Sequence, residues 1–523
     1  KLMIRDVLIS AGKLFFQNQK GMWNALNIHE GVMTEAVVEV EKNLFLKSVG
    51  FKNYLHLFNV NKPFYVNPKL VSMEYAVRGS IAKRAAELKR LGRTIIPCNI
   101  GNPQALGQPP LTFFRQVLSL LEYPELLKDK TNQISPVFSD TAFDYGHTIM
   151  EKMETGLGAY SDSKGHEFIR EAIAEFIDKR DDVVKRDGIR SNPDTIFLTD
   201  GASEGAKNII ELLITSRQDG IMIPIPQYPL YSATIHRCGG VQVNYYPDED
   251  NGWILTRNAL EDSYSQAEAD GVNIRAIVVI NPGNPTGSVL TKESVDEVVA
   301  FSSDKGIAII ADEVYQENTY GSKFHSFAKA VWNRPHFPLF SLHSVSKGFY
   351  GECGHRGGYL EVRNSPKLES TDQSLNEVLF RQASVNLCSN TVGQVLVYLM
   401  VTPPHEESVM GKLHKKEVKS ILKDLQEKAL IIKQSFTEME GVQCFGEIGA
   451  LYLFPRLDVL PDQSTDFDYC MALLESTGLS TVNGGGFGQK EGTHHLRIAF
   501  LPLKSMLEEV LPKWIEFHQN FIK

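Results

Sequence analysis

Between about residues 160 and 385 the chain alternates short apolar runs with stretches of helical spacing, which restricts the fold more than any other feature. The runs are four to eight residues long and rich in Ile, Val, Leu and Phe, as in strands covered on both faces. They are TIFLTD, IMIPIP, RAIVVINP, IAIIADE, LFSLHS and GGYLEV. After the first run, apolar residues recur on one helix face: Ala206, Ile209, Ile210 and Leu213. We predict an α/β fold whose large domain is a helix-flanked, mostly parallel sheet.

A second, smaller α+β domain is predicted from the sequence beyond residue 410. A charged helical stretch there precedes the strand-like pieces ALYLFPRL and HHLRIAF and a closing helix. We expect residues from 70–150 to complete this domain, including an amphipathic helix over 80–92. The predicted division is a lead-in at 1–65, an N-terminal part of the small domain at 66–155, the large domain at 156–390 and the C-terminal small domain at 391–523.

Composition excludes several classes of protein. The 523 residues carry a net charge of −9, with no basic block or zinc-finger spacing, which argues against a nucleic-acid partner. No apolar stretch approaches the roughly 20 residues that span a bilayer. The six cysteines never form CxxC, as expected for reduced thiols in an intracellular enzyme. His494–His495 is too small a group for a metal site, so no metal is expected.

The first 29 residues are basic, with Lys1, Arg5, Lys13 and Lys20 against Asp6 alone. A mitochondrial presequence remnant has this character, although Arg and Ser are few. A start that is not the natural one explains the segment equally well. The expected location is therefore the cytoplasm or the mitochondrial matrix.

Three polar residues follow predicted strands of the sheet. Asn284 lies in NPGNPTG, Asp312 in ADEVYQ and Lys347 in SVSKG. Ligands of open α/β sheets bind just outside the carboxyl ends of the strands, so these residues should meet at one site. An amide, a carboxylate and a lysine suit an aldehyde cofactor with a basic ring nitrogen, and pyridoxal phosphate is the obvious candidate.

Seven motifs in a fixed order extend this pattern over residues 66–520. They are NIGNPQALGQPPLTFFRQVL, FLTDGAS, PIPQYPLYSA, VVINPGNPTG, ADEVYQEN, SVSKGFYGECGHRGGY and ASVNLCSN. Together they resemble the fold-type I, class I aminotransferases, and within them the alanine aminotransferase branch. The resemblance implies ping-pong transamination between L-alanine and 2-oxoglutarate, giving pyruvate and L-glutamate. The related glutamate–glyoxylate aminotransferases share most of the motifs and remain an alternative.

The resemblance also implies roles for residues around the cofactor ring. Lys347 forms the Schiff base with the cofactor and moves the proton during transfer. Asp312 pairs with the pyridinium nitrogen, while Asn284 and Tyr315 hydrogen-bond the ring 3-oxygen. Tyr228 stacks on the ring.

Further residues are assigned by the same resemblance to the phosphate and the substrate. Ala202 and Ser203, at a helix start, hold the phosphate together with Ser344 and Arg356. Tyr160 matches a tyrosine that reaches the phosphate of the neighbouring subunit, which implies a homodimer with shared active sites. For the substrate, Arg497 clamps the α-carboxylate, and Gly101 and Asn386 line the substrate side.

Other readings of single motifs stay open. Gly201 to Gly205 fit G-x-S-x-G, which would make Ser203 the nucleophile of a serine hydrolase, but no downstream His stands out as its base. Ser344-x-x-Lys347 fits a β-lactamase motif without SDN or KTG, and GGGFG at 484–488 is a weak dinucleotide fingerprint. A cofactor-binding but inactive regulatory protein is a third possibility. Two departures from the family pattern are His355 before Arg356 and NGGGFG in place of a Pro-containing loop.

Overall fold

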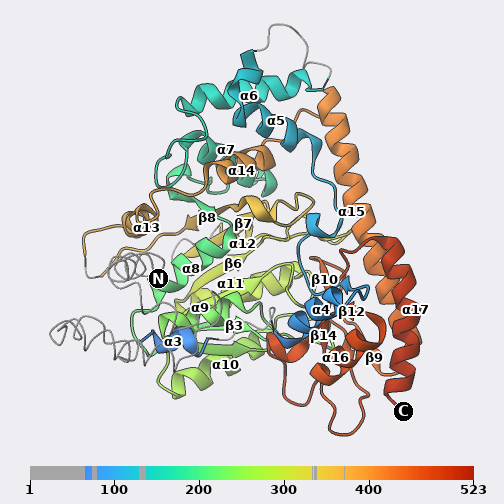
Figure 1. Ribbon diagram of the computed structural model, residues 1–523. Coiled ribbons are helices and arrows are strands. Elements are labelled where there is room, and N and C mark those ends of the chain that lie inside the picture. The colour runs from blue at the N-terminus through green and yellow to red at the C-terminus, as the bar shows by residue number, and fades with distance from the viewer. Residues whose placement is uncertain (1–64, 74–78, 129–136, 333, 335–337, 370) are drawn as a thin grey trace, which may run out of the picture. The chain divides into compact units, whose positions relative to one another are not determined.

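The computed structural model describes residues 65–73, 79–128, 137–332, 334, 338–369 and 371–523 (Figure 1). Nearly all of them belong to the compact unit Pro68–Lys523. Most of the predicted lead-in, including the basic first 29 residues, lies outside this range. The boundaries that we assign to the domains therefore stay predictions.

A seven-stranded sheet forms the centre of this unit, in the order β2-β8-β7-β6-β5-β3-β4. All neighbours pair in parallel except β8, which runs antiparallel to both β7 and β2, so the predicted mostly parallel sheet is confirmed. The strands are β2 (Ile196–Asp200), β3 (Asp219–Pro224), β4 (Val241–Tyr245), β5 (Asn273–Ile280), β6 (Ala308–Asp312), β7 (Leu339–Ser344) and β8 (Gly357–Arg363).

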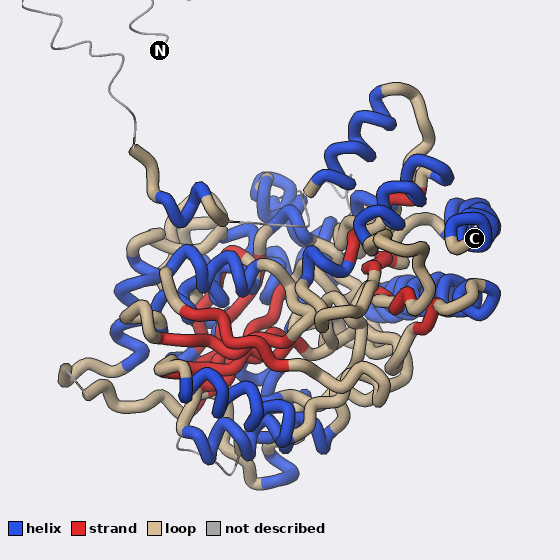
Figure 2. Tube along the Cα trace, turned by 90° about the horizontal axis from the view of Figure 1, so that it is seen from below, coloured by secondary structure: helices blue, strands red, loops and turns tan. Residues whose placement is uncertain are grey.

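Helices cover both faces of the sheet, as the unbroken apolar strands require (Figure 2). Successive residues of β5 show this, because their side chains point to opposite faces: Val278 packs in a first apolar cluster and Ile277 in a second. The first cluster is completed by α8 (Ala202–Leu213), α9 (Leu230–Cys238) and α13 (Leu375–Ser384). The second is completed by α10 (Arg257–Ala269), α11 (Lys292–Lys305) and α12 (Phe327–Ala330). At the other end of the sheet, β2 and β8 contact α7 (Glu167–Arg180) and α14 (Thr391–Val401).

The remaining elements include three small sheets. In the first, β1 (Ile96–Pro97) pairs in parallel with β12 (Leu479–Ser480), so a segment near the N-terminal side of the described chain lies beside one near its C-terminus. An ion pair between Arg84 and Glu475 links the same two segments. The other two sheets are antiparallel, β10-β14-β13 and β11-β9. Their strands are β9 (Val442–Gln443), β10 (Tyr452–Leu453), β11 (Arg456–Leu457), β13 (Val482–Asn483) and β14 (Leu496–Ala499).

Three helices outside the large sheet correspond to predicted ones: the amphipathic helix over 80–92, the charged helical stretch beyond residue 410 and the closing helix. The amphipathic helix expected over 80–92 is α4 (Ser80–Arg90), whose Ile81, Ala85 and Leu88 are buried. The other helices outside the large sheet are α3 (Pro68–Val71), α5 (Thr112–Glu122), α6 (Asp140–Met153), α15 (Val409–Ser435), α16 (Asp466–Thr477) and α17 (Lys504–Phe521). Among the described residues, no helix is both long enough and apolar enough to cross a bilayer.

Candidate active site

The three polar residues predicted to meet do follow neighbouring parallel strands. Asp312 is the last residue of β6, while Asn284 and Lys347 come four and three residues after the ends of β5 and β7. The pairing of β5 with β6 and of β6 with β7 puts all three at one edge of the sheet. Lys347 Nζ donates a hydrogen bond to the carbonyl oxygen of Gly101, at 2.7 Å, which brings this predicted substrate-side residue to the same place.

The Asp312 carboxylate is buried and held by neutral donors. Tyr231 donates its phenol proton to Oδ2 at 2.7 Å, and the amide of Val314 donates to Oδ1 at 3.4 Å. No ion pair involves Asp312 within the described ranges. Burial raises the pKa of Asp312, against the lowering effects of Tyr231 and the Lys347 charge. A cation placed against this carboxylate would therefore stabilise its ionised form.

A chain of hydrogen bonds runs from Arg497 through Asn284 and Tyr315 to Tyr452. The side-chain amide of Asn284 donates to the Tyr315 hydroxyl at 3.4 Å, and Tyr315 donates to the Tyr452 hydroxyl at 3.3 Å. Arg497 Nη1 donates to Asn284 Oδ1 at 3.1 Å, and Nη2 donates to the Asn99 carbonyl at 2.9 Å. Arg497 Nε is buried and has no hydrogen-bond acceptor among the described residues. Since unpaired buried donors are costly, this nitrogen marks a place for an anionic or carbonyl ligand.

Tyr452 lies at the centre of this group. Its ring is 4.2 Å from the guanidinium carbon of Arg497, a cation–π distance. Burial by itself would raise the pKa of Tyr452, but the charges of Lys347 and Arg497 outweigh it and lower that pKa. A Cβ atom on Gly101 would come within 1.9 Å of the Tyr452 hydroxyl oxygen, so a side chain at position 101 does not fit.

The start of α8 forms an anion cradle. Gly201 precedes the helix with φ +75°, and no side chain in the described part of the chain caps the first helical N–H groups. Arg356 Nη2 donates to Ser203 Oγ at 3.2 Å and to the Asp200 carbonyl at 3.1 Å, so a positive charge lies beside the helix start. Ser344 lies opposite Gly358 in the sheet, and Gly358 in turn packs against the amide of Ala202. The four residues predicted to bind phosphate thus gather around one helix terminus.

The other three predicted residues are placed differently. Tyr228 lies in the turn that leads into α9, three residues before Tyr231, and packs against the apolar cluster that contains α8 and α9. Tyr160 exposes 76% of its surface. The Asn386 amide is exposed and donates to Glu204 Oε1 at 2.8 Å, rather than to the Lys347 and Arg497 group. The roles assigned to these three residues stay predictions.

Sequence reasoning missed Tyr231, Tyr452 and Asn99 as parts of the site. Tyr231 lies in the same PIPQYPLY motif as Tyr228, at helical spacing from it, and this was the available signal. Tyr452 is part of the ALYLFPRL strand, in which it resembles any apolar core residue. Asn99 contributes a backbone carbonyl, which no sequence pattern identifies.

The competing motifs gain no geometric support from the described part of the chain. Ser203 Oγ accepts from Arg356, and no histidine is hydrogen-bonded to it, so the hydrolase dyad is missing. Ser344 Oγ accepts from the amide of Ser346. His495 contacts Glu249 and Gln489, but no cluster of three or more His, Cys, Asp or Glu suitable for a metal occurs among the described residues.

Comparison with known proteins defines the class that this fold and site represent. Residues 130–512 match the model of the family described as "Aminotransferase class I and II", and the chain belongs to that family. A probable mitochondrial alanine aminotransferase of Dictyostelium discoideum is 41% identical over 86% of this chain and 87% of its own length.

Other relatives of similar identity carry names that state a different substrate or no activity. A protein of Arabidopsis thaliana named glutamate–glyoxylate aminotransferase 2 is 40% identical over 87% of this chain and 95% of its own length. A Saccharomyces cerevisiae protein named inactive alanine aminotransferase is 40% identical over 87% of this chain and 93% of its own length. Among solved structures, an alanine aminotransferase of Pyrococcus furiosus superposes with a TM-score of 0.70 at 25% identity, covering 87% of this chain and all of that one. The expected fold-type I aminotransferase architecture is thus confirmed.

Proposed function

We propose that this chain is a pyridoxal-phosphate-dependent aminotransferase that exchanges the amino group between L-alanine and 2-oxoglutarate, giving pyruvate and L-glutamate. The observation that carries the proposal is the convergence of Lys347, the buried Asp312 and the unpaired Nε of Arg497 at one edge of the sheet. The names of the relatives at about 41% identity support the choice of substrates.

The residues fit pyridoxal phosphate in three independent respects. The cradle of Ala202, Ser203 and Arg356 offers backbone and charge-assisted donors to a phosphate group. Asp312 is a buried carboxylate without a cationic partner among the described residues, which suits a protonated ring nitrogen. Lys347 has its amine at the same edge, within reach of an aldehyde. When bound, the cofactor supplies an electron sink that stabilises negative charge at the substrate Cα.

Each side chain then has a definite task. Lys347 Nζ would hold the cofactor and would carry the proton that leaves the substrate Cα. Asp312 would face the ring nitrogen and favour its protonated form, and Tyr231 holds that carboxylate in place. The Asn284 amide and the Tyr315 hydroxyl lie 3.4 Å apart and can donate to one ring oxygen.

Substrate binding is assigned to Arg497. Its planar guanidinium is fixed by Asn284, Asn99 and the face of Tyr452, which leaves one edge for a carboxylate. A carboxylate held this way orients the Cα–H bond toward Lys347. Gly101 and Tyr452 restrict the room beside it.

A homodimer with shared active sites belongs to the proposal. The exposed Tyr160 would reach the phosphate of the neighbouring subunit, and its 76% exposure in the single chain is consistent with that role. We further propose a mitochondrial or cytoplasmic location, since relatives with and without "mitochondrial" in their names are similarly close.

The test is absorption spectroscopy of the purified full chain with added pyridoxal phosphate, before and after each amino acid. We expect a visible band from the bound cofactor that is lost with L-alanine and with L-glutamate, and that is absent in Lys347→Ala. Turnover should require 2-oxoglutarate as acceptor. If L-glutamate bleaches the band and glyoxylate is a better acceptor than 2-oxoglutarate, the chain would instead be a glutamate–glyoxylate aminotransferase.

Two further outcomes reject the proposal in different ways. A bound chromophore that no amino acid changes would indicate a protein that binds the cofactor but is inactive; the yeast relative is also named inactive. If no cofactor binds at all, the assignment of Lys347 and Asp312 fails.

A further inference from the structure

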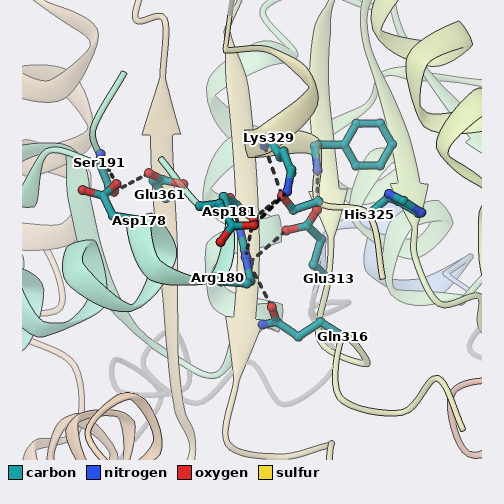
Figure 3. A network of polar contacts seen from close by, with 12 residues as sticks. Asp178, Arg180, Asp181, Ser191, Glu313, Gln316, His325, Lys329 and Glu361 are labelled. Atoms are coloured by element: carbon teal, nitrogen blue, oxygen red, sulfur yellow. Dashed lines mark hydrogen bonds and ion pairs between the residues drawn. The ribbon is translucent and has the colours of Figure 1, made fainter. Parts of the chain in front are cut away.

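A buried polar cluster joins the end of α7 to the turn that follows β6 (Figure 3). Its members are Arg180 and Asp181 at the end of α7, and Glu313 and Gln316 in the turn after β6. Their side chains expose only 15%, 4% and 2% of their surface at Arg180, Asp181 and Glu313. The catalytic roles proposed above use none of these residues.

The Arg180 guanidinium makes contacts in two directions. On one side, Nε and Nη2 donate to the two oxygens of Asp181 at 3.0 and 2.8 Å, a side-on pair. On the other side, Nη1 donates to Gln316 Oε1 at 2.9 Å and lies 3.7 Å from Glu313 Oε2. A planar fork can satisfy both sides at once, whereas a lysine amine cannot.

Both carboxylates of the cluster also tie down the start of α12. Glu313 Oε1 accepts from the amide of Phe327 at 2.8 Å, and Asp181 Oδ1 accepts from the Ser326 hydroxyl at 2.7 Å. The turn after β6 is therefore bound to α7 through Arg180 and to α12 through Glu313. These contacts are buried, so little water competes with them.

The turn between residues 312 and 316 contacts two separate groups of residues. Asp312 and Tyr315 contact Tyr231, Asn284 and Tyr452 in the candidate active site. Glu313 and Gln316 contact Arg180. A shift of the turn on the Arg180 side would consequently move both residues assigned to the cofactor ring.

We propose that Arg180 is a positioning residue, which through Gln316 and Glu313 fixes the turn that carries Asp312 and Tyr315 and so sets how tightly the cofactor ring is held. This inference rests on the proposed function for its effect on the cofactor. The fixing of the turn itself is a property of the chain alone and can be measured without cofactor.

The experiment compares three variants of the full chain. Arg180→Lys keeps the charge but loses the fork, and Gln316→Met removes one neutral acceptor with little change in volume. Arg363→Met is the matched control, because Arg363 is a similarly buried guanidinium (10% exposed) paired with Glu361 at 2.8 Å. Within the described residues, no hydrogen bond or ion pair joins Arg363 to residues 312–318.

Two readouts are taken for each variant. Hydrogen–deuterium exchange of the peptide over 312–318 in the cofactor-free chain should rise about tenfold in Arg180→Lys and Gln316→Met, which corresponds to about 1.4 kcal/mol of local opening. The dissociation constant for pyridoxal phosphate should rise roughly ten- to hundredfold in the same two variants. Arg363→Met should show neither change in this peptide nor the loss of affinity.

Three results would overturn the proposal. Unchanged exchange over 312–318 in both variants means that Arg180 does not fix the turn. Equal effects in Arg363→Met mean that the substitutions lower stability in general. Faster exchange with unchanged cofactor affinity means that the position of the turn does not determine how tightly the cofactor is held. If the unsubstituted chain binds no pyridoxal phosphate, the proposed function fails, and the exchange data alone still decide whether Arg180 fixes the turn.

Discussion

The Tyr231 hydroxyl is the side-chain donor that holds Asp312 in the described structure, at 2.7 Å from Oδ2. This hydrogen bond favours the ionised carboxylate, so its loss in Tyr231→Phe should raise the pKa of Asp312 further. A more readily protonated Asp312 pairs less well with a ring nitrogen. We expect the dissociation constant for pyridoxal phosphate to rise roughly tenfold, about 1.4 kcal/mol, and this loss of affinity to shrink as pH rises and the carboxylate ionises.

Tyr245 provides a matched control for this prediction. It is as buried as Tyr231, and its hydroxyl donates to the Val278 carbonyl at 2.7 Å, inside the sheet layer and away from Asp312. Tyr245→Phe should cost about 1 kcal/mol of unfolding free energy while leaving cofactor affinity unchanged. Equal losses of affinity in both variants would contradict a specific role for Tyr231.

Gly101 and Tyr452 form a close pair that a double-mutant cycle can test. In Gly101→Ala the new Cβ would come within 1.9 Å of the Tyr452 hydroxyl oxygen, so one of the two must shift, and a shift of Tyr452 would disturb its contact with Arg497. We expect KM for L-alanine to rise by roughly ten- to a hundredfold. Tyr452→Phe removes the clashing oxygen and should restore part of this loss, with a coupling energy of about 1 kcal/mol or more. Additive effects would show that the two positions do not share space during catalysis.

At the scale of elements, the junction of α7, β6 and α12 contains a carboxyl group whose titration should affect stability. Burial raises the pKa of Glu313 to about 7, despite the Arg180 charge. Since the unfolded chain has the lower, ordinary pKa, this group favours the folded state below about pH 4.5, and its contribution is lost as pH rises toward 7. Glu313→Gln, whose amide oxygen can still accept from Phe327, should remove up to about 3 kcal/mol of this pH dependence.

Urea denaturation of the cofactor-free chain at pH 5 and pH 7.5 measures this effect. The decrease in midpoint between the two pH values should be smaller in Glu313→Gln than in the unsubstituted chain. Glu509→Gln serves as the control because its side chain is 72% exposed, and it should leave the decrease as it was. The same decrease in all three proteins would show that Glu313 does not titrate in this range.

The elements differ in how far their sequences determined them. Strands β5, β6 and β7 were predictable because each is an unbroken apolar run that must be covered on both faces. The edge strand β4 was missed, since VQVNY alternates apolar and polar residues and its exposed side chains weaken the strand signal. The end of α7 reads as FIDKRDD, an ordinary solvated helix end, yet Arg180 is buried there. Its partner Gln316 lies 136 residues away, a contact that no local pattern contains.

At the scale of the whole molecule, the candidate site draws on widely separated parts of one chain. Gly101 and Arg497 come from the segments that flank the large sheet, while Asp312 and Lys347 follow its strands. Motif order made this convergence predictable for residues inside motifs. Contacts such as that between Arg497 and the Asn99 carbonyl depend on how the β1 and β14 segments pack, which the sequence does not specify locally.

The last expectation concerns the assembly of two chains. Tyr160 exposes 76% of its surface, and in the proposed dimer its hydroxyl would donate to the phosphate bound by the partner. Tyr160→Phe should therefore weaken pyridoxal phosphate binding about tenfold, while the mass of the assembly, measured by sedimentation, should equal that of the unsubstituted protein. Tyr123, which is 60% exposed, offers the control Tyr123→Phe, with affinity expected to stay unchanged.

Mixing two variants tests the sharing of sites more directly. In a mixed dimer of Lys347→Ala and Tyr160→Phe chains, one of the two sites combines Lys347 of one chain with Tyr160 of the other. That site has every assigned group, so its cofactor affinity should match the unsubstituted protein, while the other site has lost both groups. Cofactor titration of the mixed dimer should thus show one tight site per dimer. If both chains instead bind as they do alone, each site is built from a single chain, and Tyr160 has no part in its partner's phosphate cradle.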